Sequence, residues 1–377
     1  MYTRLLKAPK QQSFLLLGPR GTGKTAWLQQ ALPDALTFDL LDSQTYVRLS
    51  ANPSLIAELI PVRHRDWVVI DEIQRVPDLL NEVHRLIESR KLKFALTGSS
   101  ARKLRGRGVN LLAGRALTLH MHPLTAAEVG SDFDVARAVR FGCLPFAYTT
   151  DDPKGYLASY ASTYLREEVL QEGLARNLAA FSRFLEAASF SQGSVLNMAS
   201  VARDSSVNAK VVEDYFQVLE DLLIAVRLPV FTRRAKRRLV AHPKFYFFDA
   251  GVFQALRPRG PLDAEEEIQG PAIETLFLQQ LRAVNDYRRR GYAIHYWRTT
   301  AGDEVDFVLY GEHGLLAFEV KRSSQVRSGD LDGLRVFGND FPSAKRYLVH
   351  TGTRRWHESG IEIVPLAEIL VELGSVL

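Results

Sequence analysis

Residues 14–25 read FLLLGPRGTGKT, and this is the most informative segment of the chain. The apolar run Phe14–Leu17 leads into a glycine-rich turn, which is followed by the helical pattern TAWLQQAL. The turn satisfies the pattern G-x-x-x-x-G-K-[ST] in the required order of strand, loop and helix. Glycines let the backbone curl so that its N–H groups face an anion, so the segment predicts a phosphate-binding loop at a helix N-terminus.

The loop predicts that the protein binds ATP together with Mg²⁺. We expect Lys24 to reach the β and γ phosphates and the hydroxyl of Thr25 to bind the metal. A second motif, WVVIDE at residues 67–72, adds the carboxylate of Asp71 to this site. The predicted nucleotide-binding residues are Gly18, Pro19, Arg20, Gly21, Thr22, Gly23, Lys24, Thr25 and Asp71.

Residues 67–72, WVVIDE, read as a buried strand that ends in two carboxylates, 46 residues after Thr25. We expect Asp71 to hold magnesium and Glu72 to orient and deprotonate the attacking water. A strand that ends in Asp-Glu is common, and alone it would indicate a structural role. Behind a phosphate-binding loop, it predicts ATP hydrolysis.

Two further candidates follow along the chain. KFALTGSS (93–100) reads as a strand that ends in small hydroxyls, of which Ser99 or Ser100 is expected to sense the γ-phosphate, with Ser99 included in the catalytic set. Arg115 precedes another strand and is a candidate arginine finger for a neighbouring subunit, where it would stabilise transition-state charge. Ordinary surface charge is the alternative for Arg115.

Composition and length bound the fold. The 377 residues are 46% apolar and 24% charged, which is typical of compact globular domains and predicts two or three of them. Strands and helices alternate from Ser13 to about Met121, which predicts α/β architecture with a doubly wound parallel sheet. The expected divisions are an ATPase domain with the start of a helical lid (1–150), a helical and winged-helix region (151–243) and a third domain (244–377).

The chain has one cysteine, Cys143, so an intrachain disulfide framework and a cysteine-based zinc cluster are excluded. No stretch approaches the about 18 apolar residues of a membrane span. We therefore expect a cytoplasmic protein without membrane contact. The net charge of +5 is mild, and basic residues gather in 102–107, 233–238 and 288–290, either as phosphate contacts or as solvated surface.

The middle of the chain predicts a helix-turn-helix with a wing. Val195–Arg203 and a periodic stretch from Val211 to Leu223 flank a polar turn, and two apolar strands, 224–231 and 239–248, flank a basic segment. The second helix is acidic, so we expect it to pack against a neighbouring domain or subunit. Contacts with DNA are assigned to the wing residues Arg233, Arg234, Lys236, Arg237 and Arg238.

Near the C-terminus, GDEVDFVLY (302–310) and LLAFEVKR (315–322) predict a hairpin that turns at 312–313. This register sets Asp306 opposite Glu319 and Glu304 opposite Lys321. Asp306 and Glu319 are candidate magnesium ligands, with Lys321 to position or activate water and Glu274 as a further ligand. A Glu304–Lys321 ion pair on a solvent face is the alternative. Asp249, between a strand and a helix, is expected to cap that helix.

The ordered series GPRGTGKT, WVVIDEIQRVPDLL, LTGSSARKL, GRALTLHMHPLTAAE and GCLPFAY resembles bacterial and archaeal AAA-plus ATPases that carry a C-terminal restriction-endonuclease-like domain of unassigned function. The resemblance spans nearly the whole chain, and its C-terminal part is similar to the PD-(D/E)xK nuclease core. It implies a homo-oligomer, such as a hexameric ring, with ATP between subunits.

Two functions are consistent with these features. The first is an ATPase that binds and remodels or processes DNA, including branched DNA, with a nuclease-like C-terminal domain. The second is a signalling or regulatory ATPase whose C-terminal domain is a catalytically inactive module for a protein partner. The carboxylates around Asp306 are where the two hypotheses differ.

Overall fold

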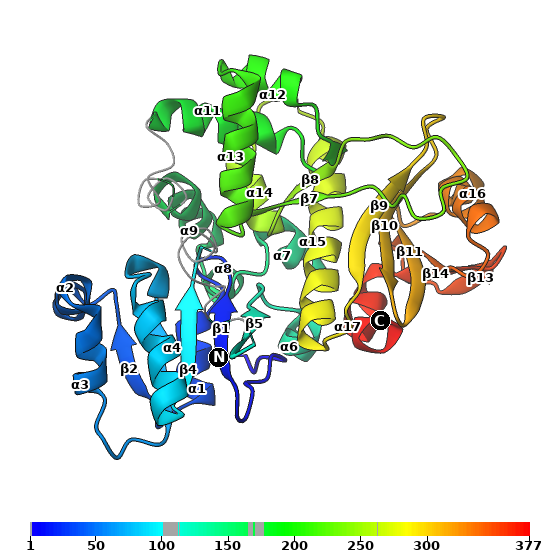
Figure 1. Ribbon diagram of the computed structural model, residues 1–377. Coiled ribbons are helices and arrows are strands. Elements are labelled where there is room, and N and C mark those ends of the chain that lie inside the picture. Colours follow the sequence, from blue (N-terminus) through cyan, green and yellow to red (C-terminus); the bar gives the residue numbers. More distant parts are fainter. Residues whose placement is uncertain (1, 101–111, 113, 165–168, 170–176, 262) are drawn as a thin grey trace. The chain divides into compact units, whose positions relative to one another are not determined.

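Figure 1 shows the computed structural model of the chain, which describes residues 2–100, 112, 114–164, 169, 177–261 and 263–377. The chain divides into two compact units. The N-terminal unit comprises Arg4–His122 and Asp221–Ile224, and the C-terminal unit comprises Met1–Thr3, Pro123–Glu220 and Ala225–Leu377. The division therefore falls at His122, and residues 123–150, which we placed with the ATPase domain, lie in the C-terminal unit.

The N-terminal unit is built on a parallel sheet, as predicted, with five strands among the described residues. Their order is β2-β3-β4-β1-β5. The strands are β1 (Ser13–Leu17), β2 (Leu36–Asp39), β3 (Trp67–Asp71), β4 (Lys93–Gly98) and β5 (Ala116–His120). Strands β1 and β3 are buried along their whole length, which explains their unbroken apolar runs. Because β4 lies between β1 and β3, residues at its end lie between the two motifs predicted to bind ATP.

Helices of the N-terminal unit pack apolar stripes on this sheet. In α4 (Leu79–Arg90), the buried residues Leu79, Leu80, Val83 and Leu86 recur at helical spacing and join the core of the unit. The other helices are α1 (Lys24–Ala31), α2 (Ser43–Ala51) and α3 (Ile56–Leu59), with 3-10 turns at Pro53–Leu55 and Ile73–Arg75.

The first half of the C-terminal unit is mainly helical. Its helices are α6 (Ala126–Val129), α7 (Val135–Phe141), α8 (Pro145–Thr149), α9 (Pro153–Ser159), α11 (Leu178–Ser189), α12 (Met198–Ser205), α13 (Ala209–Asp221) and α14 (Ala250–Leu256). A small antiparallel sheet accompanies them, in the order β6-β8-β7, with β6 (Ser194–Val195), β7 (Ala225–Leu228) and β8 (Lys244–Phe247). The helices predicted around residues 195–223 are therefore present as α12 and α13.

The second half of the C-terminal unit carries a mixed sheet, whose strands are drawn in yellow to red in Figure 1. Its order among the described residues is β13-β14-β12-β11-β10-β9. The strands are β9 (Ala293–Arg298), β10 (Glu304–Gly311), β11 (Gly314–Lys321), β12 (Lys345–His350), β13 (Trp356–Glu358) and β14 (Ile361–Pro365). The helices are α15 (Glu265–Tyr287), α16 (Asp332–Asp340) and α17 (Leu366–Val376).

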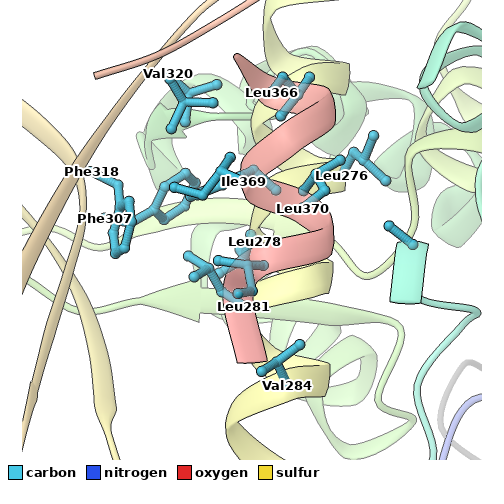
Figure 2. Close-up of a cluster of buried hydrophobic side chains, with 14 of the residues drawn as sticks. Leu276, Leu278, Leu281, Val284, Phe307, Phe318, Val320, Leu366, Ile369 and Leu370 are labelled. Atoms are coloured by element: carbon cyan, nitrogen blue, oxygen red, sulfur yellow. The ribbon is translucent and has the colours of Figure 1, made fainter. Parts of the chain in front are cut away.

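Apolar side chains cover both faces of this sheet. Figure 2 shows one of these cores, in which Leu278 and Leu281 of α15 and Ile369 of α17 lie beside Phe307 and Phe318 of the strands. In the core on the other face, Leu334 and Phe337 of α16 pack against strand side chains. These side chains are Trp297, Val305, Val308, Ala317, Leu348, Ile361 and Ile363.

The two strands predicted to form a wing are present as β7 and β8, and the long connection between them is attached to β9. The N–H of Phe231 donates to the carbonyl of Tyr296 at 2.7 Å, and the N–H of Val240 donates to the carbonyl of Arg298 at 3.1 Å. The flanking strands β7 and β8 are shorter than the predicted ones. The two strands flanking the basic segment therefore pair antiparallel, from Ala225 with Phe247 to Leu228 with Lys244, while the ends of the connection between them pair with the neighbouring sheet.

Among the residues that the structure describes, no helix has both the length and the apolar character needed to cross a membrane.

Candidate functional site

The predicted phosphate-binding loop begins where β1 ends. Gly18 donates its N–H to the carbonyl of Gly98 on β4 at 3.2 Å, and a Cβ on Gly18 would lie 2.5 Å from the carbonyl oxygen of Met121. Gly23 caps α1 with φ of 91°, a conformation that residues with a side chain rarely adopt. Gly18 is thus required because the backbone of Met121 lies so close to it, and Gly23 is required because its backbone is left-handed.

Lys24 is the first residue of α1, and its side chain returns over the loop. Its Nζ donates to the carbonyl oxygens of Gly18 at 2.7 Å and Pro19 at 3.2 Å, and only 5% of the residue is exposed. The ammonium is therefore held against the loop, where it can bind a phosphate group by exchanging neutral acceptors for charged ones.

Thr25 and Asp71 come together as predicted. The hydroxyl of Thr25 donates to Oδ2 of Asp71 at 2.7 Å, and the hydroxyl of Thr97 on β4 donates to Oδ1 of the same carboxylate. Thr97 also accepts the N–H of Glu72 at 2.9 Å. A hydroxyl and a carboxylate beside a phosphate-binding loop are oxygen ligands of the kind that Mg²⁺ prefers, so the residues fit the expected metal. Thr97 was not among the predicted residues, although it lies two positions before Ser99 on the same face of its strand.

Glu72 lies at a strained backbone position beside Ser99. Its φ of 59° and ψ of 46° are left-handed, which costs about 1–3 kcal/mol for a residue other than glycine. The hydroxyl of Ser99 donates to Oε2 of Glu72 at 3.3 Å. Ser100 is also buried. The structure therefore brings Ser99 to the predicted catalytic carboxylate.

Gln74 is a residue of this site that the sequence did not indicate. Its Nε2 donates to Oε2 of Glu72 and, at 2.9 Å, to the hydroxyl of Ser99. Gln74 is 6% exposed, and no described residue bonds to its buried Oε1. The amide thus holds the carboxylate of Glu72 in place and leaves an acceptor in the site.

Arg4 is a second residue that the motifs did not reveal. Its guanidinium donates to the carbonyl oxygen of Thr22 at 2.9 Å and also to that of His122. The nearby carbonyl of Leu6 accepts the indole N–H of Trp27 at 3.2 Å. The segment before β1 therefore fastens the phosphate-binding loop to the end of β5.

Arg115 lies at the amino end of β5, whereas the phosphate-binding loop follows the carboxyl end of β1. Strand β5 is parallel to β1 and pairs Ala116 with Ser13, so Arg115 is level with the start of β1. With a rise of about 3.3 Å per residue, roughly 15 Å of strand separate the start of β1 from Gly18. The Nε of Arg115 lies 2.5 Å from Oε1 of Glu88. Arg115 therefore lies away from the phosphate-binding loop of its own chain.

Asp249 caps α14, as predicted, and also fixes a second turn. Its carboxylate accepts the N–H groups of Gly251 at 2.9 Å and Val252 at 3.1 Å, together with that of Cys143 at 2.7 Å. A Cβ on Gly142, whose φ is 72°, would lie 1.9 Å from Oδ1 of Asp249. Burial raises the pKa of Asp249 to about 6. This carboxylate organises the GCLP turn.

In the C-terminal unit, the hairpin has the predicted register, since Phe307 pairs with Phe318 and Gly311 with Gly314. Asp306 and Glu319 meet at its open end. The N–H of Asp306 donates to Oε2 of Glu319 at 3.3 Å, and Nζ of Lys321 donates to Oε1 of Glu319 at 2.6 Å. The two carboxylates and the lysine are therefore together, as the spacing predicted.

The alternative for this hairpin, a Glu304–Lys321 ion pair on a solvent face, is not the pairing in the structure, where Lys321 pairs with Glu319. The ladder between β10 and β11 begins at Phe307 and does not reach Glu304, and β10 has an irregularity between Val305 and Val308. Glu304 instead lies 3.1 Å from the guanidinium of Arg298 and also contacts the ammonium of Lys244.

Lys244, the first residue of β8, is the residue that sequence reasoning missed here. Its Nζ lies 3.0 Å from Oδ1 of Asp306 and 3.9 Å from Oε2 of Glu274, in addition to its contact with Glu304. Its side chain is 3% exposed. The hydroxyl of Tyr246 donates to Oε2 of Glu274 at 2.7 Å. We call these residues the lysine-centred cluster: Lys244, Tyr246, Glu274, Glu304, Asp306, Glu319 and Lys321.

The cluster changes the acidity of its members. Burial, and then the charge of Asp306, raise the pKa of Glu319 to about 8, and the same two causes raise that of Glu274 to about 8. Burial opposes the charged form of Lys321, but the charges of Glu319 and Asp306 outweigh it and raise the pKa of Lys321. The carboxyl of Glu319 therefore holds its proton more tightly in the folded protein than an exposed glutamate does.

Stability should fall as pH rises through the range in which Glu319 loses its proton. The pKa of Glu319 is about 8 in the folded chain against an ordinary value of 4.5, so the folded state binds its proton more tightly than the unfolded state. This stabilisation is complete below pH 4.5 and is lost as pH rises through 8. Urea unfolding from pH 5 to 9 should show the loss in the wild type, a smaller loss in Glu319→Gln, and a wild-type loss in the exposed control Glu312→Gln. An equal fall in all three would contradict the assignment.

The candidate magnesium ligands Glu274, Asp306 and Glu319 do not fit a bound metal. Asp306 accepts from Lys244 through Oδ1 and from the N–H of Val320 through Oδ2 at 3.0 Å. Both oxygens of Glu319 also accept from protein donors. Within the described parts of the chain, no group of three or more His, Cys, Asp or Glu residues is arranged to hold a metal ion.

The candidate DNA contacts lie together on the long connection after β7. The guanidinium of Arg233 stacks over the ring of Tyr310 at 4.7 Å, and Nε of Arg237 lies 2.8 Å from Oδ2 of Asp340. All of the predicted residues are exposed, and we call them the basic segment: Arg233, Arg234, Lys236, Arg237 and Arg238. The basic stretch 102–107 lies outside the described residues.

The acidic helix α13 is partly neutralised within the C-terminal unit. Arg227 of β7 lies 2.6 Å from Oε1 of Glu213 and 2.6 Å from Oε2 of Glu220. These ion pairs explain the acidic face without a nucleic-acid role.

Comparison with protein families agrees with the N-terminal site. Residues 10–130 match the family described as an AAA domain, and they form an AAA-like P-loop domain. Residues 132–263 and 269–369 match two families described as domains of unknown function, DUF8612 and DUF4143.

Similar whole proteins are distant. An uncharacterised protein of Haemophilus influenzae is 20% identical over 361 residues, which cover 89% of this chain and 86% of that protein. Among solved structures, a signal transduction ATPase with numerous domains and a tetratricopeptide repeat sensor, from Pyrococcus horikoshii, is 15% identical with a TM-score of 0.23. The match covers 76% of this chain but only 48% of that one. Protein VC1899 of Vibrio cholerae is 13% identical, with 96% of each chain covered and a TM-score of 0.23.

Proposed function

We propose that this protein hydrolyses ATP with Mg²⁺ at the N-terminal unit. The observation that carries the proposal is the joining of Thr25, Asp71 and Thr97 by hydrogen bonds at the end of the phosphate-binding loop. Lys24 and the loop N–H groups would bind the phosphates, and Thr25 with Asp71 would hold the metal. When bound, Mg²⁺ supplies charge neutralisation at the phosphate oxygens.

Glu72 is assigned to accept a proton from the attacking water. Ser99 and Gln74 keep its carboxylate in one orientation, since Ser99 donates to it at 3.3 Å and Gln74 donates to both. A base held in this way loses little orientational freedom at the moment of reaction.

The first experiment measures phosphate release from ATP by the full chain with and without Mg²⁺. Lys24→Ala should reduce hydrolysis to background because the β and γ phosphates lose their ammonium partner, whereas the exposed control Lys10→Ala should retain it. Hydrolysis by Lys24→Ala at the wild-type rate would refute the proposal.

We also propose a homo-oligomer in which Arg115 serves the nucleotide of a neighbouring subunit. The proposal is supported by the position of Arg115 at the amino end of β5, away from the phosphate-binding loop of its own chain. In the same assay, specific activity should rise with protein concentration, and Arg115→Ala should remain low at every concentration. Activity that is independent of concentration and of Arg115 would exclude this role.

A nucleic-acid partner is the favoured ligand of the basic segment. Arg233 and Arg234 line a groove of about 510 Å³ together with Tyr310 and Phe341, and Tyr310 is 38% exposed. Arginines beside an exposed aromatic ring suit phosphate contact and base stacking. ATP hydrolysis coupled to DNA remodelling therefore stays the leading hypothesis for the whole chain, with a regulatory ATPase as the alternative.

Removing two charges from the basic segment should weaken DNA binding in a salt-dependent way. For Arg234→Ala with Lys236→Ala, we expect the slope of log K against log salt to shrink by about 2, because two phosphate contacts are lost. Fluorescence anisotropy with duplex and forked DNA measures this slope. The control pair Arg63→Ala with Arg65→Ala removes the same charge from another exposed site. Equal losses in both pairs would mean that net charge alone acts.

A further inference from the structure

We infer that the ammonium of Lys244 takes the place of a divalent cation among the carboxylates of the C-terminal unit. The lysine-centred cluster then holds β8, α15 and β10 together and binds no catalytic metal. ATP hydrolysis does not use this cluster, so a test of the cluster does not depend on whether the proposed function is correct.

Three elements of the C-terminal unit meet at the ammonium of Lys244. Lys244 comes from the small sheet, Glu274 comes from α15, and Asp306 comes from β10 of the mixed sheet. The Nζ of Lys244 lies 3.0 Å from Oδ1 of Asp306 and 3.9 Å from Oε2 of Glu274. One cation thus joins three elements at the point where a metal shared by these carboxylates would bind.

The remaining oxygen atoms of Asp306 and Glu319 already accept hydrogen bonds from the protein. Mg²⁺ requires nearly octahedral coordination by oxygen at about 2.0–2.1 Å. The main-chain N–H of Val320 donates to Oδ2 of Asp306, and Lys321 and the N–H of Asp306 donate to Glu319. With Lys244 in place, no oxygen of Asp306 or Glu319 is open to a metal. Loss of the ammonium would release Oδ1 of Asp306 together with the contacts of the ammonium to Glu274 and Glu304.

Lys244 is buried among apolar and aromatic groups. The side chain of Lys244 is 3% exposed, and its ammonium lies 5.8 Å from the ring centroid of Tyr296. An ammonium that left the carboxylates would remain among apolar and aromatic groups without water, which is strongly unfavourable. A metal therefore cannot displace Lys244 by a simple side-chain rotation towards solvent.

The test measures Mn²⁺ binding to the full chain without nucleotide, by electron paramagnetic resonance of the free ion. Every protein carries Asp71→Asn so that the predicted magnesium ligand of the N-terminal site is absent. The chain with Lys244 intact should bind no Mn²⁺ that depends on Asp306. Lys244→Ala should gain one Mn²⁺ per chain, and Asp306→Asn added to it should remove that ion. The exposed control Lys345→Ala should gain none.

Two results would overturn the inference. One is stoichiometric Mn²⁺ binding to the Lys244 chain that Asp306→Asn abolishes, because it would show that metal and lysine coexist. The other is a folded Lys244→Ala chain that binds no Mn²⁺, because the cluster would then not be a cation site. If Lys244→Ala does not fold by circular dichroism, Lys244→Gln is tested for the same two outcomes.

Discussion

Glu72→Gln should slow ATP hydrolysis by between about 100-fold and 10,000-fold while ATP remains bound, because an amide cannot accept the proton of the attacking water. The amide has nearly the same shape as the carboxylate. It can still contact Ser99 and Gln74, which surround Oε2 of Glu72 in the structure. The substitution therefore separates binding from chemistry more cleanly than the loss of Lys24 does.

The measurement pairs phosphate release with the affinity for a fluorescent ATP analogue. Glu58→Gln, on the exposed surface of α3, removes the same charge from the same unit and should behave as the wild type. A fall in affinity that equals the fall in rate would indicate that Glu72 supports the loop instead of the reaction. An unchanged rate would move the role of base to another residue.

Lys244→Met should reduce the free energy of unfolding by about 3–5 kcal/mol, the range found when one partner of a buried ion pair is removed. Met fills a similar volume but leaves Asp306 and Glu304 without their ammonium. The loss should be smaller at pH 5 than at pH 7.5, because carboxylates without a cation can bind protons at the lower pH.

Urea unfolding of the full chain measures this effect, with transitions followed by circular dichroism. Lys345→Met, at the exposed start of β12, is the matched control and should change stability little. A loss below about 1 kcal/mol for Lys244→Met would show that the cluster is open to water and that the ammonium is not its main support.

Features that a short segment of the sequence encodes could be predicted. The phosphate-binding loop, the parallel strands and the hairpin register follow from spacing alone, and the structure has all three. Asp249 was expected to cap a helix, and it does. The strands on either side of the basic segment pair as β7 and β8. The connection between them also pairs with β9, about 60 positions further along the chain, and no local pattern encodes such a partner.

The amino-acid sequence by itself determined the identity of the N-terminal site, because Gly18–Thr25 and Asp71–Glu72 carry their chemistry in fixed local spacing. Only the tertiary structure decided what surrounds the other carboxylates. Lys244 reads locally as the start of an apolar strand, and it lies 62 positions from Asp306, yet folding buries the two together. A buried charge requires a partner, and that partner is chosen by packing in three dimensions, which spacing along the chain does not record.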